Sequence, residues 1–419
     1  MTLLKSSEIK WFVVLMLAMF CGMTSTVAEA ANPLPRICVR DGKFVEQASK
    51  KEFHPRGFQY VRIGFDGHHY VFAPSLYSPN CAEAMLADLS RNGFNIVRVF
   101  IGRAETVEGD GLSPRFMASF CDFLKRAERH GIHVIVVVDW IANCKRYNDI
   151  IGDMPKNMEG KQVFYLNQKH VDAKALYLQD FVNSIKKQNP RLLSTIFAYE
   201  LENEACLESA FKPFSETSGT FEFNGKSYDM SSGQQIQELA DEAFKRRCDS
   251  LVKAIHTVDP DVMVSCSVYS FNAVGRSGPG ALRTDKAVEQ HFPMRPLALV
   301  DTKLSYIDIH LYSYNEEGLD RDLQSIEWEN LKPACKKAGK PLFMGECGAY
   351  KFNHASLQEA AALMRKHIER VIAKGFKGYS YWTYDCDEQT ELYNAKMEDG
   401  VIFRAITEAN ARLKWTQNN

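Results

Sequence analysis

The run Ile135-Val136-Val137-Val138 is apolar at every position and lies inside the longer stretch of residues 133–139. Continuous apolar runs rich in β-branched residues are typical of strands buried on both faces, as in a parallel sheet covered by helices. Helix-like patterns flank this run over residues 116–130 and 172–187. The stretch therefore predicts a β-strand enclosed between helices.

The same alternation of short strand and longer helix continues along the chain from about Phe53. Strand-like runs occur at residues 57–63, 95–101, 133–139, 195–201, 262–268, 306–312, 341–346 and 377–383. Eight strands with about eight helices predict an α/β fold of the closed (β/α)8 TIM-barrel type. An open sheet of the same elements is the alternative that the chain length would also allow.

Further features concern the two ends of this barrel. Residues 37–45, with Asp41-Gly42 as a turn, predict a small N-terminal β-hairpin in a position to plug the bottom. Three connections after strands are long, at residues 140–171, 206–233 and 269–300, and the second contains a predicted hairpin with an Asn224-Gly225 turn. Because barrel active sites are built from these loops, their length predicts a substrate cleft.

Glutamates stand at two of the predicted strand ends. Glu204 follows the fourth strand and Glu346 ends the seventh, so both open onto the same rim. Cleavage of a glycosidic bond needs a proton donor for the leaving oxygen and a second carboxylate that faces the anomeric carbon. The layout therefore indicates a two-carboxylate glycosidase.

Three glutamates lie close together at the end of the fourth strand. Side-chain alternation places Glu200 and Glu202 on the same face as Glu204, so periodicity does not choose among them. Glu200 lies deeper in the strand, and we predict that it is a buried structural carboxylate. Glu204 is the better candidate because it lies at the rim beside Asn203, whose amide can hydrogen-bond a sugar hydroxyl.

Over roughly residues 53–382 the chain resembles glycoside hydrolase family 5, whose members are retaining (β/α)8-barrel glycosidases. The resemblance implies that Glu204, in Asn203-Glu204, is the general acid/base and that Glu346, in Gly345-Glu346-Cys347-Gly348, is the nucleophile. It also implies substrate-binding roles for Arg98 on strand two, His310 and Tyr312 on strand six, and Trp382 on strand eight, with Tyr312 bonded to the nucleophile. No cofactor or metal ion is implied.

The chain departs from the family pattern at three positions. Strand three ends in Asp139-Trp140 where many members have a histidine, and Trp140 mildly favours the mannan-cleaving branches and is a further candidate for sugar binding. Glu202 and Cys347 occupy positions that usually hold smaller or aromatic residues. These departures bear on specificity more than on catalysis.

The function predicted in this way is cleavage of β-1,4-linked polysaccharide, most nearly that of a mannan endo-β-1,4-mannosidase. An endo-β-1,4-glucanase or another β-glycosidase on the same barrel is the alternative. From other classes, a non-catalytic carbohydrate-binding barrel and a metal-dependent barrel hydrolase remain to be considered. His68 with His69, and Asp385 with Asp387, lack a convincing third ligand and give no metal motif.

Charge and composition limit the partners. Lys and Arg number 51 against 52 Asp and Glu, and no basic stripe is present. There is no electrostatic reason to expect nucleic acid or anionic lipid, whereas a neutral polysaccharide or oligosaccharide suits this balance. We expect a monomer with a single domain over residues 31–419.

The first thirty residues have the layout of a secretory signal peptide. Lys5 and Lys10 precede the apolar run Trp11–Phe20, and Ala28-Glu29-Ala30 fits a small-residue cleavage site. A membrane-spanning helix needs about twenty apolar residues, and this run is roughly half as long. We therefore expect a secreted or periplasmic protein without a membrane anchor once residues 1–30 are removed.

Ten cysteines remain after residue 30, and an even number in an exported chain permits disulfides. Cys144 with Cys206, and Cys347 with Cys386, follow consecutive predicted strands and are in positions to meet at one rim. Cys248 and Cys266 have the context of buried apolar thiols. The sequence does not fix the pairing, and the absence of Cys-x-x-Cys disfavours a zinc site.

Overall fold

The computed structural model describes residues 32–64, 67–102, 106–269, 291–312, 315–324, 326–413 and 415. Its central sheet is parallel, and the barrel strands in chain order are β3 (Arg56–Gln59), β4 (Ile96–Phe100), β7 (His133–Val137), β8 (Ile196–Glu200), β12 (Met263–Ser265) continued by β13 (Ser267–Tyr269), β15 (Ile307–His310), β16 (Leu342–Cys347) and β18 (Tyr379–Tyr381). β12 pairs with β8 and β13 pairs with β15, so the fifth barrel strand, interrupted at Cys266, closes the sheet. The predicted TIM barrel is confirmed.

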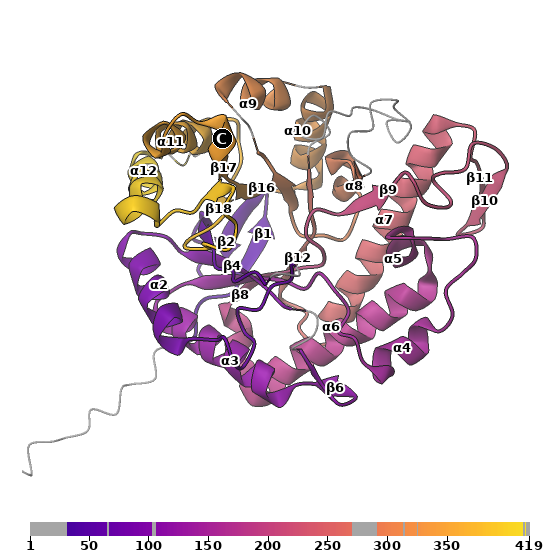
Figure 1. The fold of residues 1–419 in the computed structure, drawn as a ribbon, viewed down its shortest axis with the longest axis horizontal. Helices are drawn as coiled ribbons and strands as arrows, with labels where there is room; N and C mark the ends of the chain where they lie inside the picture. The colour runs from indigo at the N-terminus through magenta and orange to yellow at the C-terminus, as the bar shows by residue number, and fades with distance from the viewer. Residues whose placement is uncertain are drawn as a thin grey trace, which may run out of the picture. The chain divides into compact units, whose positions relative to one another are not determined.

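Helices surround these strands on the outside (Figure 1). They are α2 (Pro79–Arg91), α3 (Pro114–Arg129), α4 (Lys145–Ile151), α5 (Gln162–Leu166), α6 (Gln168–Gln188), α7 (Gly233–His256), α8 (Pro296–Val300), α9 (Glu316–Leu323), α10 (Ile326–Ala338), α11 (Leu357–Ala373) and α12 (Met397–Arg412). Helix α3 shows why such segments form: Ser113 caps it by accepting from the backbone of Phe116, and Pro114 occupies its first turn. Its buried face, which includes Phe120 and Leu124, packs into the layer between helices and strands.

The predicted N-terminal hairpin fills the bottom of the barrel. β1 (Ile37–Arg40) pairs antiparallel with β2 (Lys43–Glu46) around Asp41-Gly42, and both turn residues have positive φ. The ring of Phe44 lies 5.2 Å from that of Phe197 and 5.3 Å from that of Tyr306, inside the barrel wall. The hairpin therefore belongs to the core.

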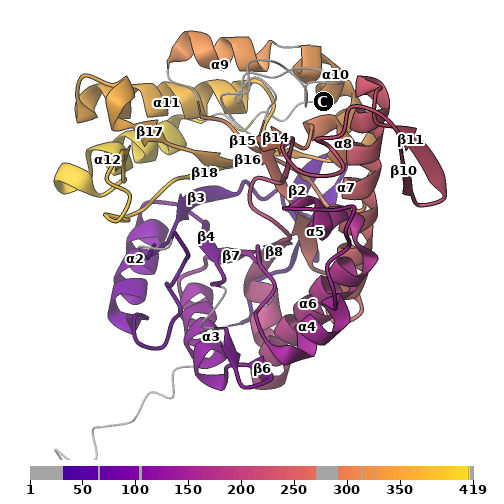
Figure 2. The same cartoon turned by 45° about the vertical axis from the view of Figure 1, so that its right-hand side comes forward.

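A second predicted hairpin is also confirmed. β10 (Thr220–Phe223) pairs with β11 (Lys226–Asp229) around the Asn224-Gly225 turn. It projects beyond α7 at the edge of the barrel (Figure 2). The long connection after the fourth strand thus contains ordered structure.

The cysteines of the described part are all free: Cys38, Cys81, Cys121, Cys144, Cys206, Cys248, Cys266, Cys335, Cys347 and Cys386. The two disulfides that the sequence allowed, Cys144–Cys206 and Cys347–Cys386, are not formed in the structure, where all four thiols are free. Cys206 accepts a hydrogen bond from Lys161 Nζ at 3.3 Å, and Cys386 donates to Glu388 at 3.1 Å. Cys248 and Cys266 are buried, as predicted.

The expected signal peptide at residues 1–30 lies outside the described residues, so the domain division and the export of the chain stay predictions. Among the described residues, no helix combines the length and the apolar character that a membrane crossing requires.

We expect Phe44→Ala to lower the free energy of unfolding by about 3 to 5 kcal/mol, because it leaves a cavity between three barrel rings. Denaturant unfolding followed by circular dichroism measures this loss. Phe352→Ala is the matched control, since Phe352 is 73% exposed and its removal should leave stability unchanged. Equal stability of the two variants would show that the hairpin is not part of the core.

Candidate active site

Arg98 lies at the centre of the site, in β4, with its side chain fully buried inside the barrel. Its guanidinium contacts both carboxylate oxygens of Glu200, at 2.7 and 2.6 Å, and Oε1 of Glu346 at 2.6 Å. The remaining N–H groups donate to Gln59 Oε1 at 2.5 Å and to Asn203 Oδ1 at 2.7 Å. All five donors of the guanidinium are therefore used, and Glu200 is the buried structural carboxylate that the sequence predicted.

Glu346 ends the seventh barrel strand and is buried. Besides Arg98, the Tyr312 hydroxyl donates to its Oε2 at 2.8 Å, as the family resemblance implied. Burial raises the pKa of Glu346, while His310, Arg98 and the hydrogen bond from Tyr312 act in the opposite direction. The contacts from Arg98 and Tyr312 thus favour the ionised carboxylate.

Glu204 lies in the connection after β8, with φ of 52° and a side chain that is 20% exposed. Its backbone N–H donates to Ser267 Oγ at 2.9 Å, and the Tyr269 hydroxyl donates to its Oε2. Burial raises the pKa of Glu204 to about 7. A carboxyl group with this pKa can hold a proton near neutral pH and release it when a charge develops nearby.

His310 connects the two glutamates. Its Nδ1 lies 2.8 Å from Glu204 Oε1 and 3.4 Å from Glu346 Oε2. Burial lowers the pKa of His310 to about 4, so the ring is neutral near pH 7 and shares a hydrogen bond with Glu204 through Nδ1. One ligand atom from each of the three side chains lies within 4.8 Å of the other two, a donor set that would also accept a metal ion.

The two predicted tryptophans lie at the same rim. Trp382 follows β18, is largely buried, and sits edge-on to the ring of Phe100 at 5.7 Å. Trp140 follows β7 and is partly buried beside His68, with the two ring centres 6.1 Å apart. Of the eight predicted site residues, six therefore share direct contacts, and the tryptophans lie around them.

Close packing leaves no room for a side chain at position 348, two residues after Glu346. A Cβ at this position would lie 2.9 Å from the Tyr312 ring and 3.1 Å from the carbonyl oxygen of Trp382. Only a residue without a side chain lets Tyr312 approach Glu346 from this side.

The expectation that Glu202 points to the same side as Glu204 was wrong. The alternation that placed it beside Glu204 ends with β8 at Glu200, and the next residues leave the strand. The Glu202 carboxylate turns away from the site and accepts from Tyr165 at 2.6 Å, with Arg247 Nη1 of α7 at 2.7 Å. This buried ion pair holds the connection that carries Glu204.

Two contacts at the site were missed by the sequence reading. Gln59 of β3 binds Arg98 and also donates to the carbonyl of Gly345 at 2.9 Å. Tyr269 ends the fifth barrel strand and binds Glu204. Its position at a strand end on the same rim was the one signal available in the sequence.

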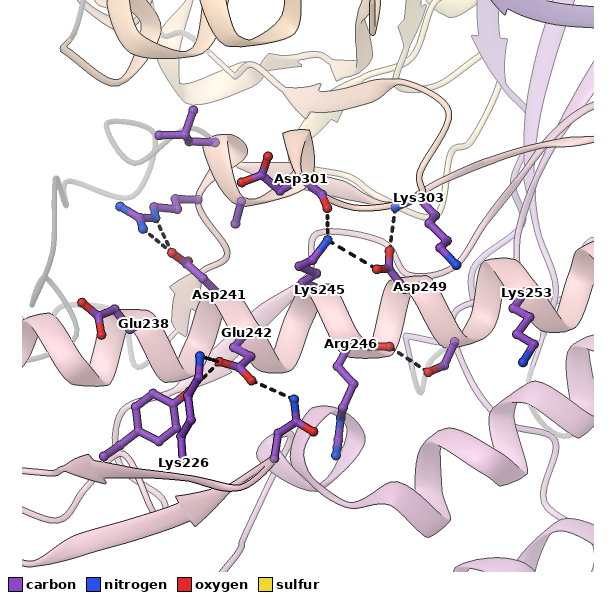
Figure 3. A pocket seen from close by; sticks show the side chains of 16 residues that line it. Lys226, Glu238, Asp241, Glu242, Lys245, Arg246, Asp249, Lys253, Asp301 and Lys303 are labelled. Carbon is purple, nitrogen blue, oxygen red and sulfur yellow. Dashed lines mark hydrogen bonds and ion pairs between the residues drawn. The ribbon is translucent and has the colours of Figure 1, made fainter. Parts of the chain in front are cut away.

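A large hollow of the described surface lies elsewhere, along α7 beside the hairpin of β10 and β11 (Figure 3). Its lining is strongly charged, and several of the charges form ion pairs. Glu242 accepts hydrogen bonds from Lys226 at 2.7 Å and from the Tyr228 hydroxyl at 2.6 Å, and Arg295 donates to Asp241 at 2.8 Å. None of the predicted site residues lines it. The contacts of Glu242 attach the hairpin to α7, and the Arg295–Asp241 pair attaches the segment before α8 to the same helix.

We expect Arg247→Met to cost about 3 to 5 kcal/mol of unfolding free energy, because it leaves the buried Glu202 carboxylate unpaired. The double variant Glu202→Gln with Arg247→Met should recover most of that loss, since the amide still accepts from Tyr165. Denaturant unfolding of the variants gives the comparison.

Lys226→Met is the matched control, because it breaks an ion pair of the same length, 2.7 Å, whose lysine is 66% exposed. Its cost should stay below about 1 kcal/mol. An equal loss of unfolding free energy in Arg247→Met and Lys226→Met would contradict a stabilising role of the buried Glu202–Arg247 ion pair.

Comparison with known proteins identifies the family of this chain. A family model described as cellulase (glycosyl hydrolase family 5) matches residues 47–386. Among curated protein sequences, none matches this chain.

Solved structures share the fold at low sequence identity. The endo-1,4-β-mannanase from Rhizomucor miehei is 14% identical with a TM-score of 0.58, over 90% of this chain and 100% of that chain. The β-mannanase from the blue mussel Mytilus edulis is 17% identical with a TM-score of 0.55, over 92% and 98%. The exo-β-1,4-mannosidase Op5Man5 from Opitutaceae bacterium strain TAV5 is 16% identical with a TM-score of 0.55, over 89% and 62%.

The family match covers most of the chain, and it includes the strands that carry Glu204 and Glu346. The chain therefore belongs to glycosyl hydrolase family 5 and is a glycoside hydrolase.

Proposed function

We propose that this glycoside hydrolase retains configuration and cleaves β-1,4-linked mannan, with Glu204 as acid/base and Glu346 as nucleophile. The observation that carries the mechanism is the close approach of the two carboxyl groups, each with an oxygen within 4.8 Å of the other. Retaining glycosidases place these groups about 5 to 5.5 Å apart, whereas inverting enzymes leave roughly 6.5 to 9.5 Å for a water molecule.

In the first step, the ionised Glu346 attacks the anomeric carbon and forms a covalent ester. The bond from that carbon to the leaving oxygen breaks, and the leaving oxygen takes the proton of Glu204. Arg98 and Tyr312 hold the Glu346 carboxylate in place for this attack. In the second step, water gives its proton to Glu204 and its oxygen to the anomeric carbon, which releases Glu346.

Three observations support mannan as the substrate. The similar solved structures named above act on β-mannan or β-mannosides, and Trp140 occupies the end of strand three. The nearly balanced charge of the chain also suits a neutral polymer. A β-1,4-glucan is the second candidate, because the matching family model is that of cellulases.

We infer that the working protein is a secreted or periplasmic monomer that begins near Ala31 and binds polysaccharide or oligosaccharide. The basis is the apolar run and the cleavage pattern of residues 1–30. Mass spectrometry of the protein exported from a bacterial host gives the mature N-terminus, and gel filtration gives its oligomeric state.

We expect the purified mature chain to release reducing sugar from mannan and glucomannan more rapidly than from soluble cellulose or mixed-linkage β-glucan. Glu346→Ala should abolish release from every polymer, because no covalent ester can form. A chelator should leave the rate unchanged, since both proposed steps use only protein carboxyl groups and water.

Each other outcome points to a different function. A preference for soluble cellulose would assign the glucan-cleaving alternative. Binding without turnover in both proteins would favour the carbohydrate-binding barrel, and loss of activity with a chelator would favour a metal at Glu204, His310 and Glu346.

The pH profile separates the two carboxyl groups. Because burial raises the pKa of Glu204 to about 7, Glu204 is protonated below that pH, and kcat/KM should fall as the pH rises through about 7. The hydrogen bond from Tyr269 lowers this pKa, so Tyr269→Phe should move the basic limb to higher pH. Tyr312→Phe is the matched comparison: it removes a bond that lowers the pKa of Glu346, so the acidic limb should move upward. Movement of the same limb in both variants would reject the assigned roles.

A further inference from the structure

Large hydrophobic side chains that remain exposed are confined to one end of the described barrel. They are Leu76, Met154, Phe211 and Phe352. Each lies in a connection that follows a barrel strand, after β3, β7, β8 and β16 respectively, on the rim that carries Glu204 and Glu346. Single exposed hydrophobic residues are ordinary, but their restriction to one rim indicates a surface that meets a ligand.

Phe352 ends a run of aromatic rings that begins at the nucleophile. Tyr312, which donates to Glu346, has its ring centre 5.8 Å from that of Tyr350. The Tyr350 ring lies 5.2 Å from that of Phe352, which is 73% exposed. The run therefore leads from the reacting carboxylate into solvent.

The backbone that presents these rings is held in place. β17 (Ala349–Tyr350) pairs antiparallel with β19 (Leu392–Tyr393), and the backbone N–H of Lys351 donates to the carbonyl of Glu391 at 2.9 Å. The 3-10 turn η4 (Lys351–Asn353) then carries Phe352 outward. A binding surface on a fixed support loses little conformational entropy when a ligand arrives.

Polar groups lie beside the exposed ring. A hollow of about 810 Å³ is lined by Phe352 together with Asn315, Glu317, Asn353 and His354. Sugars present apolar ring faces and hydroxyl edges, so an aromatic face next to amide, imidazole and carboxylate groups matches their chemistry.

We propose that Tyr350, Phe352 and this hollow form an outlying sugar-binding subsite of the cleft. The ring of Tyr350 lies between those of Tyr312 and Phe352. Phe352 would therefore bind a sugar unit of the polymer that lies further along the chain than the two units joined by the cleaved bond. The proposal rests on the proposed glycosidase function and adds a preference for long chains over short ones.

The test compares wild type with Phe352→Ala on glucomannan, which contains both candidate sugars, and on its shortest fragment that wild type cleaves. We expect KM for the polymer to rise roughly three- to tenfold, the fold-change of losing one aromatic contact, with kcat/KM for the fragment unchanged. Phe352→Tyr should restore the wild-type KM. Unchanged polymer KM, or equal loss on both substrates, would overturn the subsite.

Leu76→Ala is the matched control, since Leu76 is exposed on the same rim but lies outside the aromatic run. Its KM for the polymer and its kcat/KM for the fragment should equal those of wild type. A rise in polymer KM equal to that of Phe352→Ala would show that the whole apolar rim contributes to binding, which would overturn a subsite at Phe352. If wild type cleaves no glycan, the proposed function fails, and migration in native gels that contain glucomannan then tests the subsite. Less retardation of Phe352→Ala than of wild type supports the subsite, and equal migration overturns it.

Discussion

The site depends on one buried cation, the guanidinium of Arg98. Removing such a charge from water is costly unless every donor is paired, and here all five N–H groups bind acceptors of four residues, on three barrel strands and the connection after β8. Two of those acceptors are carboxylates, Glu200 and Glu346, so the cluster carries one negative charge in excess when both are ionised. Burial is the main cause that raises the pKa of Glu204 to about 7, while the hydrogen bond from Tyr269 and the charge of Arg98 act in the opposite direction. Arg98 therefore binds Glu200 and Glu346 directly, whereas burial accounts for the raised pKa of Glu204.

Glu204 depends on a second arrangement, because it lies outside regular structure with a left-handed backbone. Three contacts fix the segment: Asp139 accepts from the backbone N–H of Asn203 at 3.0 Å, Ser267 accepts from that of Glu204, and Arg247 holds Glu202. They come from strand three, strand five and α7 respectively. The segment that carries Glu204 is therefore fixed by contacts from three different parts of the barrel, and His310 lies between Glu204 and Glu346.

The parts that followed from the sequence are those governed by local pattern. Apolar runs such as residues 135–138 predicted the strands, and Asp41-Gly42 predicted the hairpin, because burial and turn geometry depend on residues that are close in sequence. The proximity of Glu204 and Glu346 could be predicted because parallel strand ends share a rim. Glu202 could not be placed, since alternation holds only while the strand continues. Tyr269 and Gln59 could not be assigned because their partners are distant in sequence, and free thiols resulted where paired cysteines were allowed.

The buried polar network and the exposed apolar side chains lie on different parts of this fold. The groups that bind one another around Arg98 stand on strands or directly after them, where neighbouring strands fix their positions. The exposed side chains of the rim, including Phe352, stand in the connections, where a change disturbs no buried charge. The barrel itself is shared with solved structures at 14 to 17% identity, and connections of a fold generally tolerate change better than its buried strands. The connections are therefore the place to look for what determines the substrate of this glycoside hydrolase, because a change there leaves the buried charges around Arg98 in place.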